Sequence, residues 1–155
     1  TDQTTLRILV DADACPVKEE VYRVAFRTQV QVRIVSNSYM RVPVDPLVEQ
    51  VVVDNKFDAA DDYIAGVADA WAVVVTADIP LADRCLKAKA TVIAPNGKPF
   101  TANSIGTALA TRAIMQDLRA GGDIVGGPPP FTKADRSRFL SALDEALVRL
   151  RRRSD

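Results

Sequence analysis

Short apolar segments alternate along this chain with segments whose apolar residues recur every three or four positions. Apolar runs rich in β-branched residues and bounded by turn residues predict strands, and they cover residues 6–10, 30–35, 51–53, 72–76 and 91–94. Helical spacing predicts helices over residues 16–28, 57–70 and 79–88. Strands that alternate with helices indicate an α/β fold of Rossmann-like type, with three layers and a mainly parallel sheet.

The pattern becomes helical after residue 100. We predict one long helix from about Ala102 to Ala120, which Gly121 and Gly122 would end. Residues 126–130 read Gly-Gly-Pro-Pro-Pro, a composition that excludes regular structure and indicates a linker.

A last helix is predicted after this linker. Thr132 and Asp135 have the spacing of a capping box, with Asp in place of the usual Glu. The apolar stripe of this helix consists of Leu140, Leu143, Leu147 and Leu150. We therefore expect one domain over residues 1–155, in which a helical C-terminal part (101–155) caps an αβ core (1–100).

The first predicted strand ends in two carboxylates, Asp11 and Asp13, and Pro16 marks a helix start soon after them. Open α/β sheets bind ligands beyond the carboxyl ends of their strands, so Asp11 stands where such a fold places its chemistry. A cap of the next helix would explain Asp13 but not Asp11. Two nearby carboxylates repel each other, and a bound cation is the natural compensation.

Further carboxylates recur at comparable places in the later strand–helix units. Three of them share one face of the second predicted helix, namely Asp58, Asp61 and Asp62. The helix dipole offers an alternative explanation for acids in a first turn. Asp78 follows the strand over residues 72–76, and Asp83 lies one to two turns further on. Because parallel strands end at one edge, we expect Asp11 and Asp78 to converge if their strands are close together.

Composition excludes several kinds of chemistry. The chain has no histidine, which removes Ser-His-Asp and Cys-His nucleophile schemes together with the usual zinc hydrolase ligands. A set of three or four oxygen ligands instead suits Mg²⁺ or Mn²⁺. One or two such ions could activate water and stabilise the leaving oxygen of an in-line attack on a phosphodiester.

Cysteine usage and hydropathy point to the cytoplasm. Cys15 and Cys85 lack metal-finger spacing, and reduced thiols are the simplest interpretation. No apolar window approaches the length of a membrane span, and the first residues lack the apolar core of a signal peptide. We therefore expect a cytoplasmic protein without a membrane partner.

Charge is divided unevenly along a chain whose net charge is zero. Residues 1–85 carry a net charge of −6 and residues 86–155 a net charge of +6. Carboxylates for an ion and cations for a polyanion would suit a metal-assisted phosphodiester site, although chance would explain the division equally well. Candidates for contact with substrate or its phosphates are Ser36, Asn37, Arg112, Lys133 and Arg136, and Thr76 could orient water or phosphate.

Four segments of the chain resemble a known family. They are Val10–Lys18, Phe57–Asp61, Thr76–Ala82 and Gly126–Pro129. In this order, and over nearly the whole chain, they closely resemble the uncharacterised bacterial YaiI/YqxD family, which is similar to PIN and NYN nuclease-like domains. The resemblance implies a PIN-like fold, in which acids after the first strand, on a middle helix and after the fourth strand hold Mg²⁺ or Mn²⁺ for RNA cleavage.

The resemblance also implies roles for individual residues. The three acids correspond to Asp11, Asp61 and Asp78, with Thr76 in the T-x-D motif as an orienting hydroxyl. Asp13 and Asp83 are supporting candidates for metal ligands. The chain departs from ordinary PIN domains in its Asp-Ala-Cys-Pro loop and its Gly-Gly-Pro-Pro segment.

We therefore expect a nuclease that hydrolyses phosphodiester bonds in RNA with Mg²⁺ or Mn²⁺. One alternative is a non-catalytic nucleic-acid or protein-binding module of the same fold. Another is a phosphatase of the haloacid dehalogenase type, with Asp11 as nucleophile and Asp13 as acid. The order of motifs disfavours this phosphatase, because its acidic pair should come last, whereas Asp61 and Asp62 precede Thr76.

Overall fold

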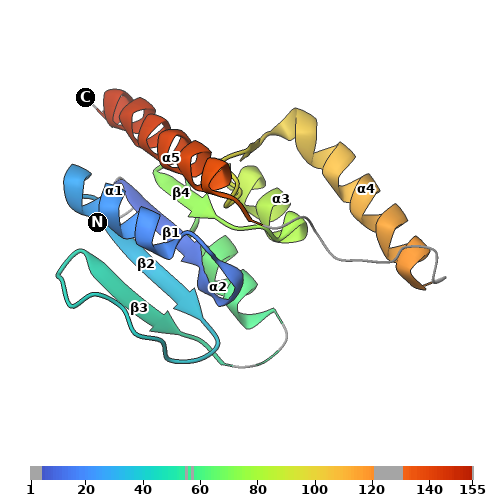
Figure 1. The fold of residues 1–155 in the computed structure, drawn as a ribbon, viewed down its shortest axis with the longest axis horizontal. Coiled ribbons are helices and arrows are strands. Elements are labelled where there is room, and N and C mark those ends of the chain that lie inside the picture. The colour runs from blue at the N-terminus through green and yellow to red at the C-terminus, as the bar shows by residue number, and fades with distance from the viewer. Residues whose placement is uncertain (1–4, 55, 57, 121–130, 155) are drawn as a thin grey trace.

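The structure is a computed structural model that describes residues 5–54, 56, 58–120 and 131–154 (Figure 1). Strands and helices alternate in its first hundred residues, as the apolar pattern predicted. In chain order the elements are β1 (Arg7–Asp11), the 3-10 helix η2 (Ala12–Ala14), α1 (Lys18–Thr28), β2 (Gln31–Ser36), β3 (Val48–Val52), α2 (Ala59–Val67), β4 (Ala72–Val75), α3 (Ile79–Lys87), β5 (Thr91–Ile93), β6 (Pro99–Phe100), α4 (Ala102–Ala120) and α5 (Lys133–Ser154).

The strands form one sheet in the order β3-β2-β1-β4-β5-β6, and all neighbours are parallel except β5 and β6. The chain builds outward from the central β1, first to β2 and β3 and then to β4 and β5. The order of strands therefore reverses between β1 and β4. In open α/β sheets, such a switch point opens a crevice at the carboxyl ends of the strands.

Helices cover both faces of this sheet, which makes three layers (Figure 1). On one face, α1 and α5 pack against Ile8 and Val10 of β1. On the other face, α2 and α3 cover Leu9 of the same strand. Residues 7–10 of β1 and all four residues of β4 are buried, as expected for a parallel sheet between two helical layers. The expected three-layer α/β fold with a mainly parallel sheet is confirmed, and it is consistent with a PIN-like arrangement.

The two C-terminal helices are placed differently. α5 lies beside α1 and buries Leu143, Leu147 and Leu150 of its predicted stripe, together with Phe139, which the prediction omitted. α4 begins beside α3 and then leads away from the sheet (Figure 1). None of the described helices combines the length and the apolar character needed to cross a membrane. The predicted helix end at Gly121–Gly122 and the linker at 126–130 lie outside the described residues.

Several element ends differ from the prediction for local reasons. α1 begins at Lys18 rather than at Pro16, because η2 occupies the residues directly after β1. α2 is shorter than predicted at both ends. Asp58 has a left-handed backbone with φ of 64°, which a helix cannot continue. At the other end, the Asp69 side chain accepts a hydrogen bond from the Trp71 N–H at 2.9 Å and favours a turn.

Candidate functional site

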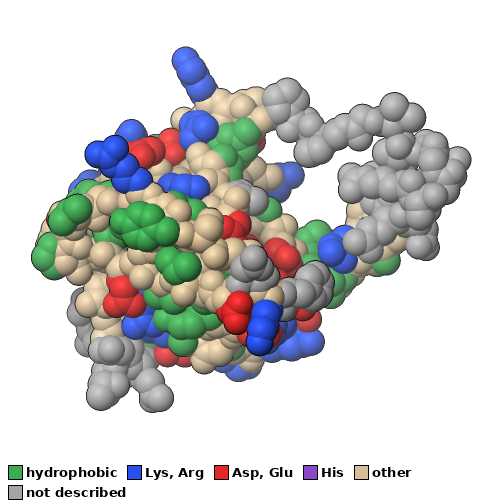
Figure 2. Space-filling view, turned by 90° about the horizontal axis from the view of Figure 1, so that it is seen from below, with side chains coloured by type: hydrophobic (Ala, Val, Ile, Leu, Met, Phe, Trp, Pro, Cys, Tyr) green, Lys and Arg blue, Asp and Glu red, His purple; other side chains and the backbone are tan. Residues whose placement is uncertain are grey.

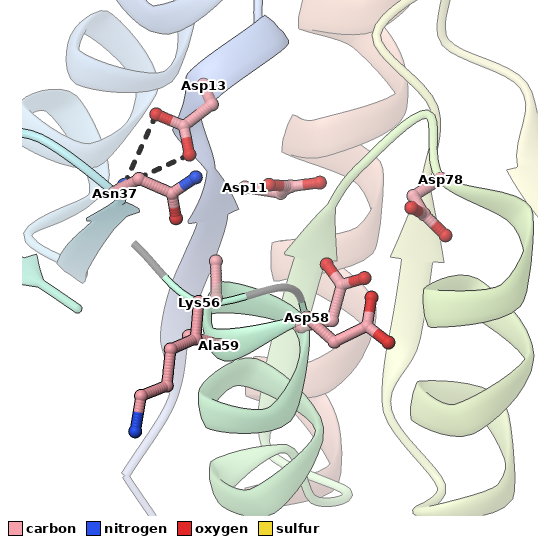
Figure 3. A pocket seen from close by; sticks show the side chains of 9 residues that line it. Asp11, Asp13, Asn37, Lys56, Asp58, Ala59 and Asp78 are labelled. Atoms are coloured by element: carbon pink, nitrogen blue, oxygen red, sulfur yellow. Dashed lines mark hydrogen bonds between the residues drawn. The ribbon is translucent and has the colours of Figure 1, made fainter. Parts of the chain in front are cut away.

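A cavity of about 480 Å³ opens at the carboxyl edge of the sheet, beside the switch point between β1 and β4. Five carboxylates dominate its wall (Figure 3): Asp11, Asp13, Asp58, Asp61 and Asp78. They come from the end of β1, from η2, from the start of α2 and from the connection between β4 and α3. The structure therefore brings together four acids that sequence analysis assigned to the site, and adds Asp58.

Thr76 connects the two central strands at this edge. Its side chain is buried, and its Oγ1 donates a hydrogen bond to Oδ2 of Asp11 at 2.8 Å. The same oxygen accepts a hydrogen bond from the backbone N–H of Asp78 at 3.0 Å. One hydroxyl thus fixes the orientation of the Asp11 carboxylate and the position of the Asp78 backbone.

Asp13 and Asp78 also hold their own surroundings in place. The backbone N–H of Asn37 donates to both carboxylate oxygens of Asp13, at 3.0 and 3.3 Å, which connects η2 to the end of β2 (Figure 3). Asp78 is the N-cap of α3, and its Oδ1 accepts a hydrogen bond from the Leu81 N–H at 2.9 Å. The N-cap of α1 is Val17, so the alternative explanation of Asp13 as that cap is wrong.

Proximity and burial disfavour negative charge at this site. Burial raises the pKa of Asp11 most; the Thr76 hydrogen bond lowers it, and the charges of Asp78 and Asp13 raise it. The pKa of Asp61 is raised to about 6, first by burial and then by the charges of Asp78, Asp11 and Asp58. Such mutual repulsion is typical of functional sites, where a cation or a proton relieves it.

The donor set fits a hard divalent cation that keeps part of its water shell. Within the described residues, no three His, Cys, Asp or Glu side chains are already arranged to hold a metal ion. Mg²⁺ needs no such cage, because it retains several waters and takes only one or two carboxylates directly. An open cavity lined by carboxylate oxygens meets that requirement, whereas it would not suit a structural zinc ion.

Asp83 and Ser36 lie away from the lining of this cavity. Asp83 faces Lys87 one turn further along α3, with 2.9 Å between Oδ2 and Nζ. Ser36 is buried at the end of β2, and its Oγ donates to the carbonyl oxygen of Ser38 at 2.7 Å. Its neighbour Asn37 does line the cavity.

The basic candidates of the C-terminal half do not line the cavity either. Arg136 donates to the carbonyl oxygen of Pro16 at 2.7 Å and pairs with Glu20 at 3.3 Å, so it joins α5 to α1. Lys133 and Arg112 are exposed on α5 and α4. Their proposed contact with phosphate stays a prediction.

Two charged residues of the cavity wall were not among the site residues predicted from the sequence. Asp58 was interpreted as one of three acids on a helix face, but its left-handed backbone precedes α2. Asp adopts this conformation more readily than most residues, which was the available signal. Lys56 also lines the wall, with its ammonium directed away from the carboxylates (Figure 3). Its Nζ lies 3.8 Å from Oδ2 of Asp54. Nothing in the sequence indicated Lys56 as a site residue.

Comparison with known proteins identifies relatives along most of the chain. A family model described as "Uncharacterized BCR, YaiI/YqxD family" matches residues 9–149. A UPF0178 protein of Sphingopyxis alaskensis is 70% identical over 146 residues, which cover 94% of this chain and 95% of the relative. UPF0178 proteins of Bradyrhizobium diazoefficiens and Nitrobacter winogradskyi are 59% identical over 150 residues and 58% identical over 149 residues. These alignments cover 97% and 96% of this chain, and 90% and 95% of the relatives. No solved structure matches the chain.

Proposed function

This chain belongs to the uncharacterised YaiI/YqxD family, and we propose that it is a nuclease that hydrolyses phosphodiester bonds in RNA with Mg²⁺ or Mn²⁺. One observation carries the proposal. Five carboxylates from separate parts of the chain line one cavity at the switch point of a parallel sheet. That position is where open α/β folds bind ligands, and an all-oxygen donor set is what these ions prefer.

Asp11 and Asp78 are the residues best placed to hold the ion, because they stand at the ends of the adjacent strands β1 and β4. Asp13 would act through a water molecule, since its carboxylate already accepts the Asn37 N–H. A bound divalent ion supplies Lewis acidity and lowers the pKa of a water molecule.

Asp61 is suited to take the proton from the attacking water. A general base works best when its pKa is close to the working pH, and the pKa of Asp61 is raised to about 6. Thr76 contributes indirectly, by keeping the Asp11 carboxylate in one orientation.

The geometry favours this activity over an aspartyl-phosphate phosphatase. In a phosphatase of that type, the threonine at the end of the second strand would offer its hydroxyl to the phosphate. Here the hydroxyl of Thr76 is engaged by Asp11 and by the backbone of Asp78, inside the protein. A trapped aspartyl-phosphate after incubation with a phosphoryl donor would reverse this preference.

The deciding experiment compares Asp11→Asn with the native chain. We expect Mn²⁺-dependent cleavage of single-stranded RNA to fall by at least about a hundredfold, because the ion loses one of its charged ligands. The thermal transition should stay near the native value or rise, since the substitution removes an unfavourable buried charge. Asp83→Asn is the matched control, because it neutralises a carboxylate that does not line the cavity.

Unchanged cleavage by Asp11→Asn would remove this residue from the mechanism. Equal RNA binding in chelator and in Mn²⁺, with no cleavage in either, would instead support a non-catalytic binding module.

A further inference from the structure

The segment between β2 and β3 begins at the wall of the acidic cavity and holds an aromatic ring in solvent. The Tyr39 side chain is 81% exposed, and it follows Asn37, which lines the cavity, by two residues. Two residues of extended chain span at most about 7 Å. The Tyr39 backbone therefore lies at most about 7 Å from the Asn37 backbone, which is comparable to two stacked nucleotides at about 3.4 Å each.

Exposure alternates over residues 39–42 of this segment. Met40 and Val42 pack against the hydrophobic core under α1, whereas Tyr39 and Arg41 are exposed. An alternating pattern places these last two side chains on the outer side of the segment. Figure 2 shows a face of the molecule on which hydrophobic side chains are exposed among charged ones. Burial in the core thus fixes which residues of the segment face solvent.

Hydrogen bonds hold the backbone on both sides of Tyr39. Before it, the Asn37 N–H donates to Asp13 at 3.0 Å, and the Ser36 hydroxyl donates to the Ser38 carbonyl oxygen at 2.7 Å. After it, the Gln50 side chain of β3 accepts from the Met40 N–H at 2.7 Å and donates to the Met40 carbonyl oxygen at 2.8 Å. A ring on a fixed backbone loses little conformational entropy when a ligand covers it.

We propose that Tyr39 is a stacking platform for an unpaired base of a single-stranded nucleic acid, and that Arg41 binds a neighbouring phosphate. The proposal rests on the proposed function and specifies its substrate class. A flat, exposed aromatic face and a guanidinium are the groups that bind single strands without regard to sequence. A base in a duplex is already stacked on both faces and does not offer one to a protein.

Charge supports this occupant. The carboxylates of the cavity repel a phosphate chain, so a strand that crosses the cavity has to be held by groups on its rim. Arg41 is exposed, and the described residues show no ion pair for it. Arg136, by contrast, is already engaged by Glu20. Arg41 is therefore a cation available for phosphate on the segment that borders the acidic wall.

The experiment measures binding of a fluorescent 12-nucleotide single-stranded RNA by anisotropy, in chelator and in Mn²⁺. A second strand of the same length carries abasic sites, so it keeps the phosphates and lacks bases to stack. Tyr39→Ala should weaken binding of the RNA by about 5- to 150-fold, the range for one base–aromatic stack, and leave binding of the abasic strand unchanged. Tyr39→Phe keeps the ring and should bind both strands like the native chain.

Two further variants complete the design. Arg41→Ala should weaken binding of both strands and reduce the dependence on salt by about one phosphate contact. Val148→Ala removes an exposed apolar side chain on α5, and it should change neither affinity. Because Tyr39 and Arg41 are exposed, we expect all variants to fold, and thermal melts check this.

Native affinity in Tyr39→Ala, an equal loss for both strands, or no binding of either strand by the native chain would overturn the proposal. Native affinity in Tyr39→Ala would indicate that the exposed ring contacts a protein partner and not a nucleic acid. The outcome is separable from that of the proposed function. If Tyr39→Ala loses RNA binding and the native chain shows no metal-dependent cleavage, the stacking platform stands and the nuclease proposal fails. If the native chain cleaves RNA and Tyr39→Ala binds it with native affinity, the nuclease proposal stands and the platform fails.

Discussion

Asp61 shows how a carboxylate of the cavity wall affects the stability of this protein. Its pKa is raised to about 6 in the folded state, from an ordinary value of 3.8, first by burial and then by Asp78 and Asp11. Between these two pH values the folded chain keeps the proton and the unfolded chain has lost it. The folded state binds more protons there, so its stability falls as pH rises from about 4 to 6 and then stays level.

Asp61→Asn should remove this penalty. We expect the melting temperature at pH 7 to rise above the native value, and the fall between pH 4 and pH 6 to become shallower. Thermal melts across pH 4–7.5 measure both effects. Asp62→Asn is the control, because this exposed neighbour pairs with Arg84 at 2.9 Å and should not gain stability. Identical pH profiles for Asp61→Asn and the native chain would show that Asp61 carries no such strain.

Some residues of the cavity could be predicted because they follow the ends of strands. The others could not, because the direction of their side chains depends on the packing of the elements that carry them. Asp11 and Asp78 could be placed because the carboxyl ends of parallel strands all lie at the same edge of the sheet, where ligands bind. Ser36 and Asn37 are adjacent at such an end, yet neighbouring residues point to opposite sides, so Asn37 lines the cavity and Ser36 is buried. The Asp83 side chain instead pairs with Lys87, one turn further along α3. The rotation of α3 about its axis depends on its packing, which the spacing of acids does not determine.

At the scale of elements, α5 begins where its capping box predicts. The Thr132 N–H donates to Oδ2 of Asp135 at 2.8 Å, and the Asp135 N–H donates to Oγ1 of Thr132 at 3.1 Å. The two residues therefore satisfy two backbone donors at the helix start, and α5 follows from Lys133. Its buried face also includes Phe139, which lies one turn before Leu143.

Thr132→Ala should lower the free energy of unfolding by about 1 kcal/mol, the usual effect of losing an N-cap hydroxyl. The loss should appear in the global transition, because α5 packs on the sheet beside α1 and belongs to the same core. Denaturant unfolding followed by far-UV circular dichroism measures it. Ser137→Ala, at an exposed position of the same helix, should be neutral or slightly stabilising. A separate early transition for α5 would contradict its place in the core.

Short or polar elements escaped prediction for a different reason. β3 begins at Val48 rather than at Val51, because it is an edge strand whose Glu49 and Gln50 interrupt the apolar run. Pairing with β2 makes this segment a strand, and that pairing is a long-range contact. β6 has two residues, Pro99 and Phe100, and exists through its antiparallel pairing with β5. A run of two residues carries no period, so no pattern could indicate it.

At the scale of the whole molecule, strand order decides whether the acids meet. The apolar pattern predicted parallel strands, but their order in the sheet is not written in any local pattern. The convergence of Asp11 and Asp78 was therefore a conditional expectation. It holds because β1 pairs with β4, with Val10 opposite Val75. The division of charge between the two halves of the chain does not carry over to the cavity. Among the described residues of its wall, the single cation is Lys56, which comes from the acidic half.

A divalent ion bound in this cavity should stabilise the entire domain. An ion that binds the folded chain alone adds about 2.7 kcal/mol at a concentration one hundred times its Kd. For a domain of this size, we expect the melting temperature to rise by roughly 5–10 °C in Mn²⁺ or Mg²⁺ over KCl of equal ionic strength. The rise should be smaller at pH 5 than at pH 7.5, because protons compete for Asp61.

Variants locate the ion that produces this shift. Asp78→Asn removes a cavity carboxylate at the end of β4 and should abolish most of the rise. Asn still caps α3 well, so the variant should fold. Asp83→Asn, on the same helix and outside the cavity wall, should keep the full rise. An equal rise in both variants would show that the ion binds outside the cavity, and it would contradict the chemistry proposed for the carboxyl ends of β1 and β4.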